Sequence, residues 1–241
     1  MTVTERQQKI LEYLREQPNI TVAKLAKLLF VSEPTVRRDF TELDSKGMLK
    51  KAYGGALLMQ GATDTTIPYL FREHEKTTAK AKIGKEAASL VKDGMVVLMD
   101  ASTSVFHVIP YLTGKKDLIV VTSGAKTAVA LAEAGFRTYC TGGQMLIHSF
   151  SYIGAQTKRF LNDINADILF FSSRGIAADG RISDQSVEET DVRREMFLHA
   201  KKKYFLCDSS KFGKSYFYNL CSLSDIDGII SDQAFEIEEL S

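Results

Sequence analysis

Five short polar segments of the chain carry the residue types that hold an anionic ligand. They are rich in serine, threonine and glycine, and two of them contain a cation, Arg174 and Lys211. The segments are DASTS at 100–104, TSG at 122–124, TGG at 141–143, SSRG at 172–175 and DSSK at 208–211. Because hydroxyl groups, backbone N–H groups and helix N-termini bind phosphate-like anions, these segments predict a site for a phosphorylated small molecule.

The five segments each lie at the end of a short apolar run, and this order predicts where they meet. The apolar runs lie at 95–100, 118–122, 137–141, 168–172, 204–208 and 228–231. Such runs, alternating with helical stretches, are typical of a parallel sheet covered on both faces. Parallel strands end at one edge, where open α/β sheets bind ligands. A helix cap or turn explains any single segment, but five together favour a ligand site.

We predict that residues from all five segments contact the ligand. They are Asp100, Ala101, Ser102, Thr103, Thr122, Ser123, Gly142, Gly143, Arg174, Gly175, Asp208 and Lys211. The histidines show no metal-ligand spacing, so the sequence predicts no metal site, no cofactor and no catalytic residue.

A second set of residues, on one helical face near the N-terminus, has the chemistry of DNA recognition. In a helix that begins after Ser32, the side chains of Thr35, Arg38 and Thr41 point away from the apolar face. Arginine bonds guanine in a bidentate manner, and threonine contacts base edges or the thymine methyl group. The predicted DNA-binding residues are Ser32, Glu33, Thr35, Arg37, Arg38, Thr41, Lys50, Lys51 and Tyr53.

The elements that must position this face are a helix-turn-helix and a wing. The expected helix caps are Thr4 (with Gln7 in a capping box), Thr21 and Ser32, with Gly47 at the end of the third helix. Residues 48–56 then suit a β-hairpin whose lysines meet phosphates. The alternative is a three-helix packing module with a solvated Arg37–Arg38 pair; the capped helix and the following wing favour DNA binding over it.

Composition sets the class of the protein. The chain has 241 residues, a net charge of +1, 44% hydrophobic residues and 25% charged residues, as in soluble globular proteins. The N-terminus has no apolar signal core and the three cysteines have no CxxC spacing, so we expect a cytoplasmic protein with reduced thiols. Residues 1–58 carry a net charge of +3 and residues 59–241 carry −2, which suits a small basic head on a near-neutral body.

The N-terminal motifs resemble those of the DeoR family of bacterial transcriptional regulators. The matching stretches are RQQKILEYL, LAKLLFVSEPTVRRDFTELDSKGML and the GGA of the wing. In the wing the family more often has Arg at the place of Lys51 and His at the place of Tyr53. Lysine keeps the charge but loses the planar fork, so contacts to the DNA backbone are expected to differ there.

Residues 77–232 resemble the C-terminal sensor domain of the same family. The matching motifs include the DAST segment, VVTSGAKTA, TGG, SYIGAQT, ADILFFSSRGI and DSSKFG. The resemblance implies a three-layer α/β fold similar to ribose-5-phosphate isomerase A and CoA transferases, with a pocket for a phosphorylated sugar that releases a repressor from DNA. The implied organisation is a winged helix-turn-helix at 1–58, a linker at 59–76 and an effector-sensing α/β domain at 77–241.

Four positions in three segments depart from the sensor-domain pattern, so we expect a ligand that differs from the usual one of the family. The family has Gly-Thr-Thr where this chain has 101–103, and Thr-Asn where it has 122–123. Arg174 replaces a residue that is small in the family. We expect Arg174 to face the pocket and add a contact to an anion.

Several charged residues invite a catalytic interpretation that the pattern does not support. Asp184, Glu188, Glu189 and Asp191 are expected at a solvated helix start. The basic residues that follow, at 193–194 and 201–203, are expected on an exposed helix and its end, and Cys207 is expected in the core.

Three functions therefore compete. The first is a DNA-binding regulator, a homo-oligomeric repressor of a carbohydrate operon that responds to a phosphorylated sugar or related metabolite. The second is a sugar-phosphate isomerase with an appended head, for which Asp100, Asp208 and Lys211 are the candidate acid–base residues. The third is a DNA-binding protein with a purely structural body. The predicted DNA-binding domain argues against the isomerase, which would not need it. The five polar segments argue against a purely structural body.

Overall fold

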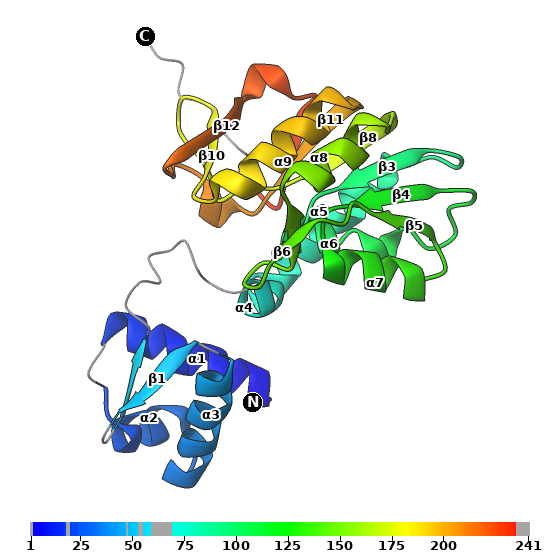
Figure 1. Cartoon of the computed structure of the whole chain (residues 1–241). Helices are drawn as coiled ribbons and strands as arrows, with labels where there is room; N and C mark the ends of the chain where they lie inside the picture. The colour runs from blue at the N-terminus through cyan, green and yellow to red at the C-terminus, as the bar shows by residue number, and fades with distance from the viewer. Residues whose placement is uncertain (1, 18–19, 47, 53–54, 59–68, 235–241) are drawn as a thin grey trace. The chain divides into compact units, whose positions relative to one another are not determined.

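The computed structural model describes residues 2–17, 20–46, 48–52, 55–58 and 69–234. The chain divides into two compact units, Met1–His74 and Glu75–Ser241. Each unit has its own hydrophobic core. The helices and strands of both units are drawn in Figure 1.

The first unit contains three helices followed by a hairpin and a short fourth helix. Its elements are α1 (Val3–Glu16), α2 (Val22–Leu29), α3 (Glu33–Ser45), β1 (Leu49–Ala52), β2 (Gly55–Leu58) and α4 (Tyr69–His74). Apolar residues at helical spacing form the core of this unit, and three of them, Ile10, Leu25 and Phe40, are each less than 3% exposed. Strands β1 and β2 pair antiparallel, as a wing requires.

Local cap chemistry sets where these helices begin. Thr21 and Ser32 cap α2 and α3, as predicted. The prediction of Thr4 as the cap of α1 is wrong: Thr2 caps this helix and forms a capping box with Glu5. The chain offers two Thr-x-x-Glu/Gln pairs two residues apart, and the earlier pair is the one used. Gly47 lies outside the described residues.

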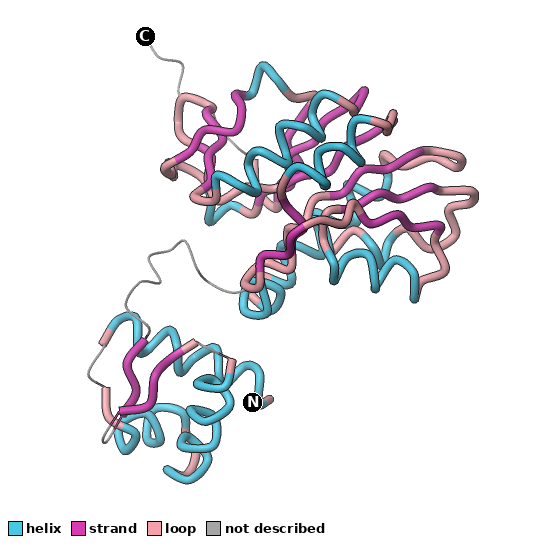
Figure 2. The backbone as a smooth tube through the Cα atoms, viewed as in Figure 1, coloured by secondary structure: helices cyan, strands magenta, loops and turns pink. Residues whose placement is uncertain are grey.

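The second unit is built on a six-stranded parallel sheet with the strand order β13-β11-β8-β3-β4-β5 (Figures 1 and 2). The strands are β3 (Val96–Met99), β4 (Ile119–Thr122), β5 (Arg137–Cys140), β8 (Ala166–Phe171), β11 (Ala200–Cys207) and β13 (Gly228–Ser231). Each predicted apolar run forms one of them. The parallel sheet expected from the sequence is therefore confirmed.

Helices cover both faces of this sheet, which confirms the three-layer α/β architecture. The helices are α5 (Thr77–Ser89), α6 (Thr103–Phe106), α7 (Ala125–Glu133), α8 (Ala155–Asn162) and α9 (Val187–Leu198). Alternate strand residues enter opposite cores: Val97 and Met99 pack with α5 and α7, while Leu98 packs with α8 and α9. The helices on the two faces are visible in Figure 1.

Two small sheets and three short 3₁₀ turns complete the unit. The sheets are β9 (Gly175–Ile176) with β10 (Arg181–Asp184) and β12 (Tyr218–Ser222), and the hairpin β6 (Gln144–Leu146) with β7 (Ser151–Ile153). The 3₁₀ turns are Ile109–Tyr111, Ser209–Lys211 and Leu223–Asp225. No described helix has both the length and the apolar character that a membrane span needs.

The lysines at 201–203 correct one prediction. They do not lie at the end of a helix but begin β11, which pairs with β8. Lys201 Nζ lies 2.8 Å from Asp167 Oδ1 on that neighbouring strand. The prediction placed these lysines at a helix end because α9 ends at Leu198, only two residues before the strand begins.

Candidate functional site

The third helix presents an exposed polar face at its N-terminal half. Ser32 caps the helix, and its hydroxyl lies 2.9 Å from that of Thr35. Arg37 is exposed and pairs with Glu33 at 3.1 Å. Arg38 is exposed, and no hydrogen bond or ion pair engages it within the part of the chain that the structure describes. Its guanidinium is therefore ready to bond an external partner.

A buried ion pair fixes the orientation of this helix. Arg6 of α1 donates two hydrogen bonds, 2.5 and 2.9 Å long, to Asp39, whose side chain is 1% exposed. The hydrogen bond to Asp39 raises the pKa of Arg6. Gln7 also donates to Glu42 at 2.5 Å. Asp39 directly follows the two exposed arginines in the sequence, and its role could not be predicted because nothing local marks a charged residue as buried.

The wing contacts the same helix. Lys51 Nζ on β1 donates to Thr41 Oγ1 at 3.4 Å, and this hydroxyl in turn donates to the carbonyl oxygen of Arg37. Thr41 and Lys51 are both exposed. Tyr53 and the side chain of Lys50 lie outside the described part of the chain. Lys51, Thr41 and the arginines of α3 thus form one polar surface.

In the second unit, the five predicted segments lie at the carboxyl ends of neighbouring strands. Two of them approach unusually closely: a Cβ atom on Gly124 would stand 2.9 Å from Ala101 Cα and 2.9 Å from Thr127 Oγ1. Glycine is therefore required where the segment after β4 meets the segment after β3.

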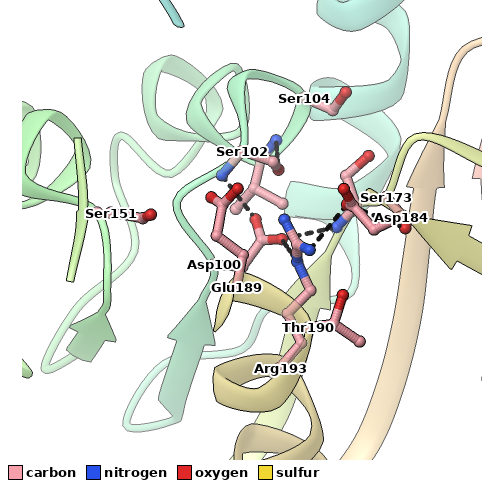
Figure 3. Close-up of polar contacts among 12 residues, drawn as sticks. Asp100, Ser102, Ser104, Ser151, Ser173, Asp184, Glu189, Thr190 and Arg193 are labelled. Atoms are coloured by element: carbon pink, nitrogen blue, oxygen red, sulfur yellow. Dashed lines mark hydrogen bonds and ion pairs between the residues drawn. The ribbon is translucent and has the colours of Figure 1, made fainter. Parts of the chain in front are cut away.

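Asp100 does not face an open site but belongs to a buried network. Its carboxylate accepts from the backbone N–H groups of Ser102 and Ser172, at 2.9 and 3.0 Å, and from Arg193 Nε at 2.9 Å. Arg193 Nη1 also donates to Asp184 at 2.9 Å. Figure 3 shows Arg193 extending from α9 between the two carboxylates. Asp100 therefore links the ends of β3 and β8 to helix α9, and both of its carboxylate oxygens accept hydrogen bonds from the protein.

This network corrects the predictions for two residues: Asp184 does not lie at a solvated helix start and Arg193 does not lie on an exposed helix face, whereas Glu188 is exposed in the first turn of α9, as predicted. The side chains of Arg193 and Asp184 are 7% and 6% exposed. Burial disfavours the charged form of Asp184, but the charges of Arg193 and Arg174 outweigh it and hold its pKa below the ordinary value. Glu189 is also partly buried and lines a small pocket. A helix whose charged side chains turn inward cannot be distinguished in sequence from one that turns them outward.

Lys211 lies close to the carboxyl end of β8. Its ammonium lies 2.7 Å from Ser172 Oγ, 3.5 Å from Ser104 Oγ and 3.9 Å from Asp208 Oδ2. Burial opposes the charge of Asp208, but Lys211, the Ser210 hydroxyl and Lys80 outweigh it and lower its pKa. Cation and hydroxyls here converge from three different strand ends.

Arg174 and Gly175 follow the same strand. Arg174 is partly buried, and its charge helps to lower the pKa of Asp184. Gly175 begins β9, and a Cβ on it would stand 2.5 Å from the carbonyl oxygen of Lys214. The loop after Lys211 therefore packs directly against the backbone next to Arg174.

The remaining predicted ligand residues are buried or partly buried, and several of them have structural roles. The hydroxyl of Thr122 accepts from Gly124 N, and that of Ser102 caps α6. Thr103 is buried in α6, and Gly142 and Gly143 turn the chain with positive φ angles of 64° and 114°. The structure brings Asp100, Ala101 and Ser123 together in one pocket with Ser151, Tyr152, Glu189, Val192 and Arg193. Its volume of about 10 Å³ admits about one water molecule.

The cysteines and acidic groups give no sign of redox or metal chemistry in the described residues. Burial raises the pKa of Cys207 to about 12, so this thiol stays protonated, and it lies in the core as predicted. No group of three His, Cys, Asp or Glu side chains in the described ranges could hold a metal ion.

Two family models match the chain. The DeoR-like helix-turn-helix domain matches residues 6–61, and the DeoR C terminal sensor domain matches residues 75–233. Three curated relatives align over nearly the whole chain. They are the HTH-type transcriptional regulator GolR of Listeria innocua (32% identity, 95% of this chain, 90% of the relative), a putative aga operon transcriptional repressor of Escherichia coli O157:H7 (31%, 98% and 89%) and a lactose phosphotransferase system repressor of Staphylococcus epidermidis (29%, 96% and 93%).

Solved structures of low sequence identity align with part of this chain. The eIF2B delta subunit of Chaetomium thermophilum aligns with a TM-score of 0.50 and 20% identity, over 67% of this chain and 58% of that one. A ribose 5-phosphate isomerase A from Neisseria gonorrhoeae aligns with a TM-score of 0.44 and 13% identity, over 57% and 54%.

Proposed function

This chain belongs to the DeoR family of transcriptional regulators, and from that premise we propose that it represses a carbohydrate-metabolism operon and responds to a phosphorylated sugar. One observation carries the proposal. The chain that presents the exposed face of α3 also brings Lys211, Ser172 and Ser104 together at the carboxyl edge of its parallel sheet. A DNA-reading surface and an anion-binding edge in one chain are what a ligand-controlled regulator needs.

The proposed DNA contacts divide by chemistry. Thr35 and Arg38, in the N-terminal half of α3, are placed to read base edges in the major groove. Lys51 on the wing, with its ammonium at the Thr41 hydroxyl, is placed to contact phosphates. Arg6 holds α3 through Asp39 and acts as a positioning residue.

The proposed organisation has three parts. Residues 1–58 bind DNA, 59–76 link the units and 77–241 sense the effector. Reading an operator by a helix-turn-helix requires two half-sites, so we expect a homo-oligomer that acts on double-stranded DNA. The lactose phosphotransferase repressor and the aga operon repressor among the relatives support a carbohydrate operon as the target.

A sugar-phosphate isomerase remains the second candidate, because Glu189 places a carboxylate in the pocket beside Asp100. Asp100 and Asp184 are both bonded to Arg193 and are poor general bases. A Glu189→Gln variant separates the two functions. An isomerase would lose turnover with this variant, whereas a regulator would show no turnover with either protein.

The test combines DNA binding with effector binding on the full chain. Mobility shift on the DNA upstream of the protein's own gene cluster should show binding that weakens with salt. A panel of sugar phosphates should then raise the melting temperature, since a ligand at ~100 times its dissociation constant adds ~2.7 kcal/mol of stability. The same compounds should release the DNA.

Lys211→Met and Lys202→Met form a matched pair for this test. Both substitutions remove one positive charge. Lys202, however, is exposed near the start of β11, at the opposite end of the strand from the proposed site. Lys211→Met should abolish the thermal response and leave DNA binding intact, and Lys202→Met should change neither. A panel that produces no thermal response in the unaltered protein would refute the proposed effector class.

A further inference from the structure

Phe30, in the turn between α2 and α3, is the most exposed large apolar side chain among the described residues. It is 94% exposed, and its φ angle of 55° lies in the left-handed region. A bulky side chain is sterically disfavoured in this region, whereas glycine adopts the same backbone freely. Because the ring is exposed, it gains no burial inside the protein that would offset the strained backbone.

A second phenylalanine with the same backbone shows contacts that Phe30 lacks. Phe150 has a φ angle of 53°, but it is partly buried, and Lys126 Nζ lies 5.7 Å from the centre of its ring. Phe30 makes no ring contact and no cation–π contact with any residue in the described ranges. Residues held in sparsely populated backbone conformations cluster at sites of function, so a role for the ring outside the protein is indicated.

The turn that carries Phe30 is fixed by backbone hydrogen bonds. The N–H of Phe30 donates to the carbonyl oxygens of Ala26 and, at 3.3 Å, of Lys27, and the N–H of Val31 donates to Ala26 at 3.0 Å. Val31 packs against the core of the unit, and Ser32 caps α3. The ring therefore projects from a fixed point of the backbone, which reduces the entropy that a contact with a partner would cost.

Helix α2 places Phe30 at a distance from the wing. The helix begins after Thr21, which forms a β-bridge with Gly55 of the wing, and it ends at Leu29, directly before Phe30. Its eight residues span about 12 Å along the helix axis. The ring of Phe30 and the wing therefore lie at opposite ends of α2.

Helix α3 gives the same placement. Thr41, in its C-terminal half, contacts Lys51 of the wing, whereas Ser32 caps its N-terminus. Phe30 precedes Ser32 by two residues, which is at most ~7 Å of extended chain. A recognition helix brings its N-terminal residues to the base edges in the major groove. An exposed ring just ahead of this end lies within reach of the same groove.

The charges beside the turn suit DNA as the partner. Lys27, in the last turn of α2, and Arg38 are exposed cations that make no hydrogen bond or ion pair within the described part of the chain. Both attract the phosphates that border the groove. Inside the groove, the apolar group that a phenyl ring contacts is the C5-methyl group of thymine.

We propose that Phe30 is a specificity-determining residue that contacts the methyl group of a thymine, at the end of each half-site that lies farthest from the wing. The inference rests on the proposed placement of α3 in the major groove, and it adds an apolar contact to the polar contacts proposed above. The ring of Phe30 acts on DNA and not within the protein.

The experiment removes the ring from the protein and the methyl group from the DNA. The probe is the fragment that the unaltered protein shifts, made with each thymine in turn replaced by deoxyuridine. One replacement in each half-site should weaken binding by the full-length protein about fourfold, the effect of one methyl-sized apolar contact. Phe30→Gly should bind the unmodified fragment more weakly by the same factor for each half-site. It should lose its sensitivity to that replacement and keep its sensitivity to the others.

Two further variants serve as controls. Phe217→Ala removes a phenylalanine of the second unit that is 82% exposed, and it should leave the DNA affinity unchanged. Phe30→Leu keeps an apolar side chain and should keep part of the sensitivity to deoxyuridine. Phe30→Gly should melt no lower than the unaltered protein, because glycine adopts the left-handed turn without strain. A clearly lower melting temperature would assign the ring a structural role and overturn the inference.

The DNA measurements decide the rest. If no replacement affects the unaltered protein, or if Phe30→Gly stays sensitive at every position, the inference fails while DNA binding by α3 stands. An equal loss by Phe30→Gly on all fragments would place the ring on the sugar–phosphate backbone, which also overturns the inference. If the unaltered protein shifts no fragment, the proposed operator fails first and the inference fails with it.

Discussion

Arg193 and Asp100 lie 93 positions apart in the chain, and their side chains meet in a hydrogen bond of 2.9 Å in the interior of the second unit. The same guanidinium reaches Asp184 at 2.9 Å, and Asp100 also accepts the N–H of Ser172. One arginine of α9 therefore ties together the ends of β3, β8 and β10. Side-chain bonds therefore hold the carboxyl edge of the sheet together in addition to the pairing of its strands.

Replacing Arg193 with Met should be among the most destabilising changes in the second unit. It leaves two buried carboxylates without their counter-charge, a change that costs ~3–5 kcal/mol. Denaturant unfolding at pH 7 measures the loss. Arg194→Ala is the matched control, because Arg194 is exposed and stacks on Tyr218, with 4.6 Å from its guanidinium carbon to the ring centre. Equal stability of the Arg193→Met variant and the unaltered protein would contradict the structural role of the network.

Arg38→Ala should weaken specific DNA binding by ~1–3 kcal/mol and relax the preference at one base position. Arg38 is free of intramolecular partners in the described structure, whereas Arg37 is engaged with Glu33. Arg37→Ala should therefore have the smaller effect. Binding to a set of operator variants by mobility shift gives both values. Unchanged base preference in Arg38→Ala would show that another face of α3 reads the DNA.

Lys51→Ala should lower DNA affinity uniformly across sequences. If Lys51 contacts one phosphate, the slope of log affinity against log salt concentration decreases in magnitude by about 1. Fluorescence anisotropy between 50 and 200 mM salt measures this slope. Lys202→Ala makes the same change in net charge on the other unit and should preserve the slope. A preserved slope in Lys51→Ala would place the wing away from the DNA backbone.

Gly175→Ala should destabilise the second unit, because the new Cβ would stand 2.5 Å from the Lys214 carbonyl oxygen and 2.9 Å from the ring of Tyr216. Overpacking of this kind costs ~1–3 kcal/mol. Ser215→Ala, in the exposed part of the same loop, is the control. Thermal melting compares the two. A variant that melts with the unaltered protein would mean that the loop moves aside at little cost.

The ionisation of Asp184 should make the stability of the folded protein decrease at acidic pH. Its pKa in the folded protein lies below the ordinary value of 3.8, because Arg193 and Arg174 outweigh the effect of burial. The ionised Asp184 therefore makes its full contribution to the free energy of unfolding above about pH 4. This contribution is lost as the pH falls through the pKa of Asp184 in the folded protein. Urea unfolding between pH 6 and pH 2.5 should show a shallower acid decline in Asp184→Asn than in the unaltered protein. Parallel declines would place the titrating group elsewhere.

Much of the architecture could be predicted because it depends on short-range patterns. The apolar runs that end at Asp100 and Asp208 are short, and polar turn residues follow them, a pattern that is typical of buried parallel strands. Thr21 and Ser32 could be identified as caps because each accepts from an N–H group three residues ahead. Thr4 was wrong because Thr2 offers the same local chemistry two residues earlier.

The sequence by itself determined the two kinds of chemistry in this protein, a capped helix with exposed arginines and a set of polar strand ends, because periodicity and cap spacing act over a few residues. Only the tertiary structure decided which charges are free. Asp100 and Arg193 form an ion pair, and so do Asp39 and Arg6, whereas Arg174 has no hydrogen-bonding partner in the described structure. Pairing between distant charges depends on which helix faces turn inward, and that depends on how whole elements pack against one another.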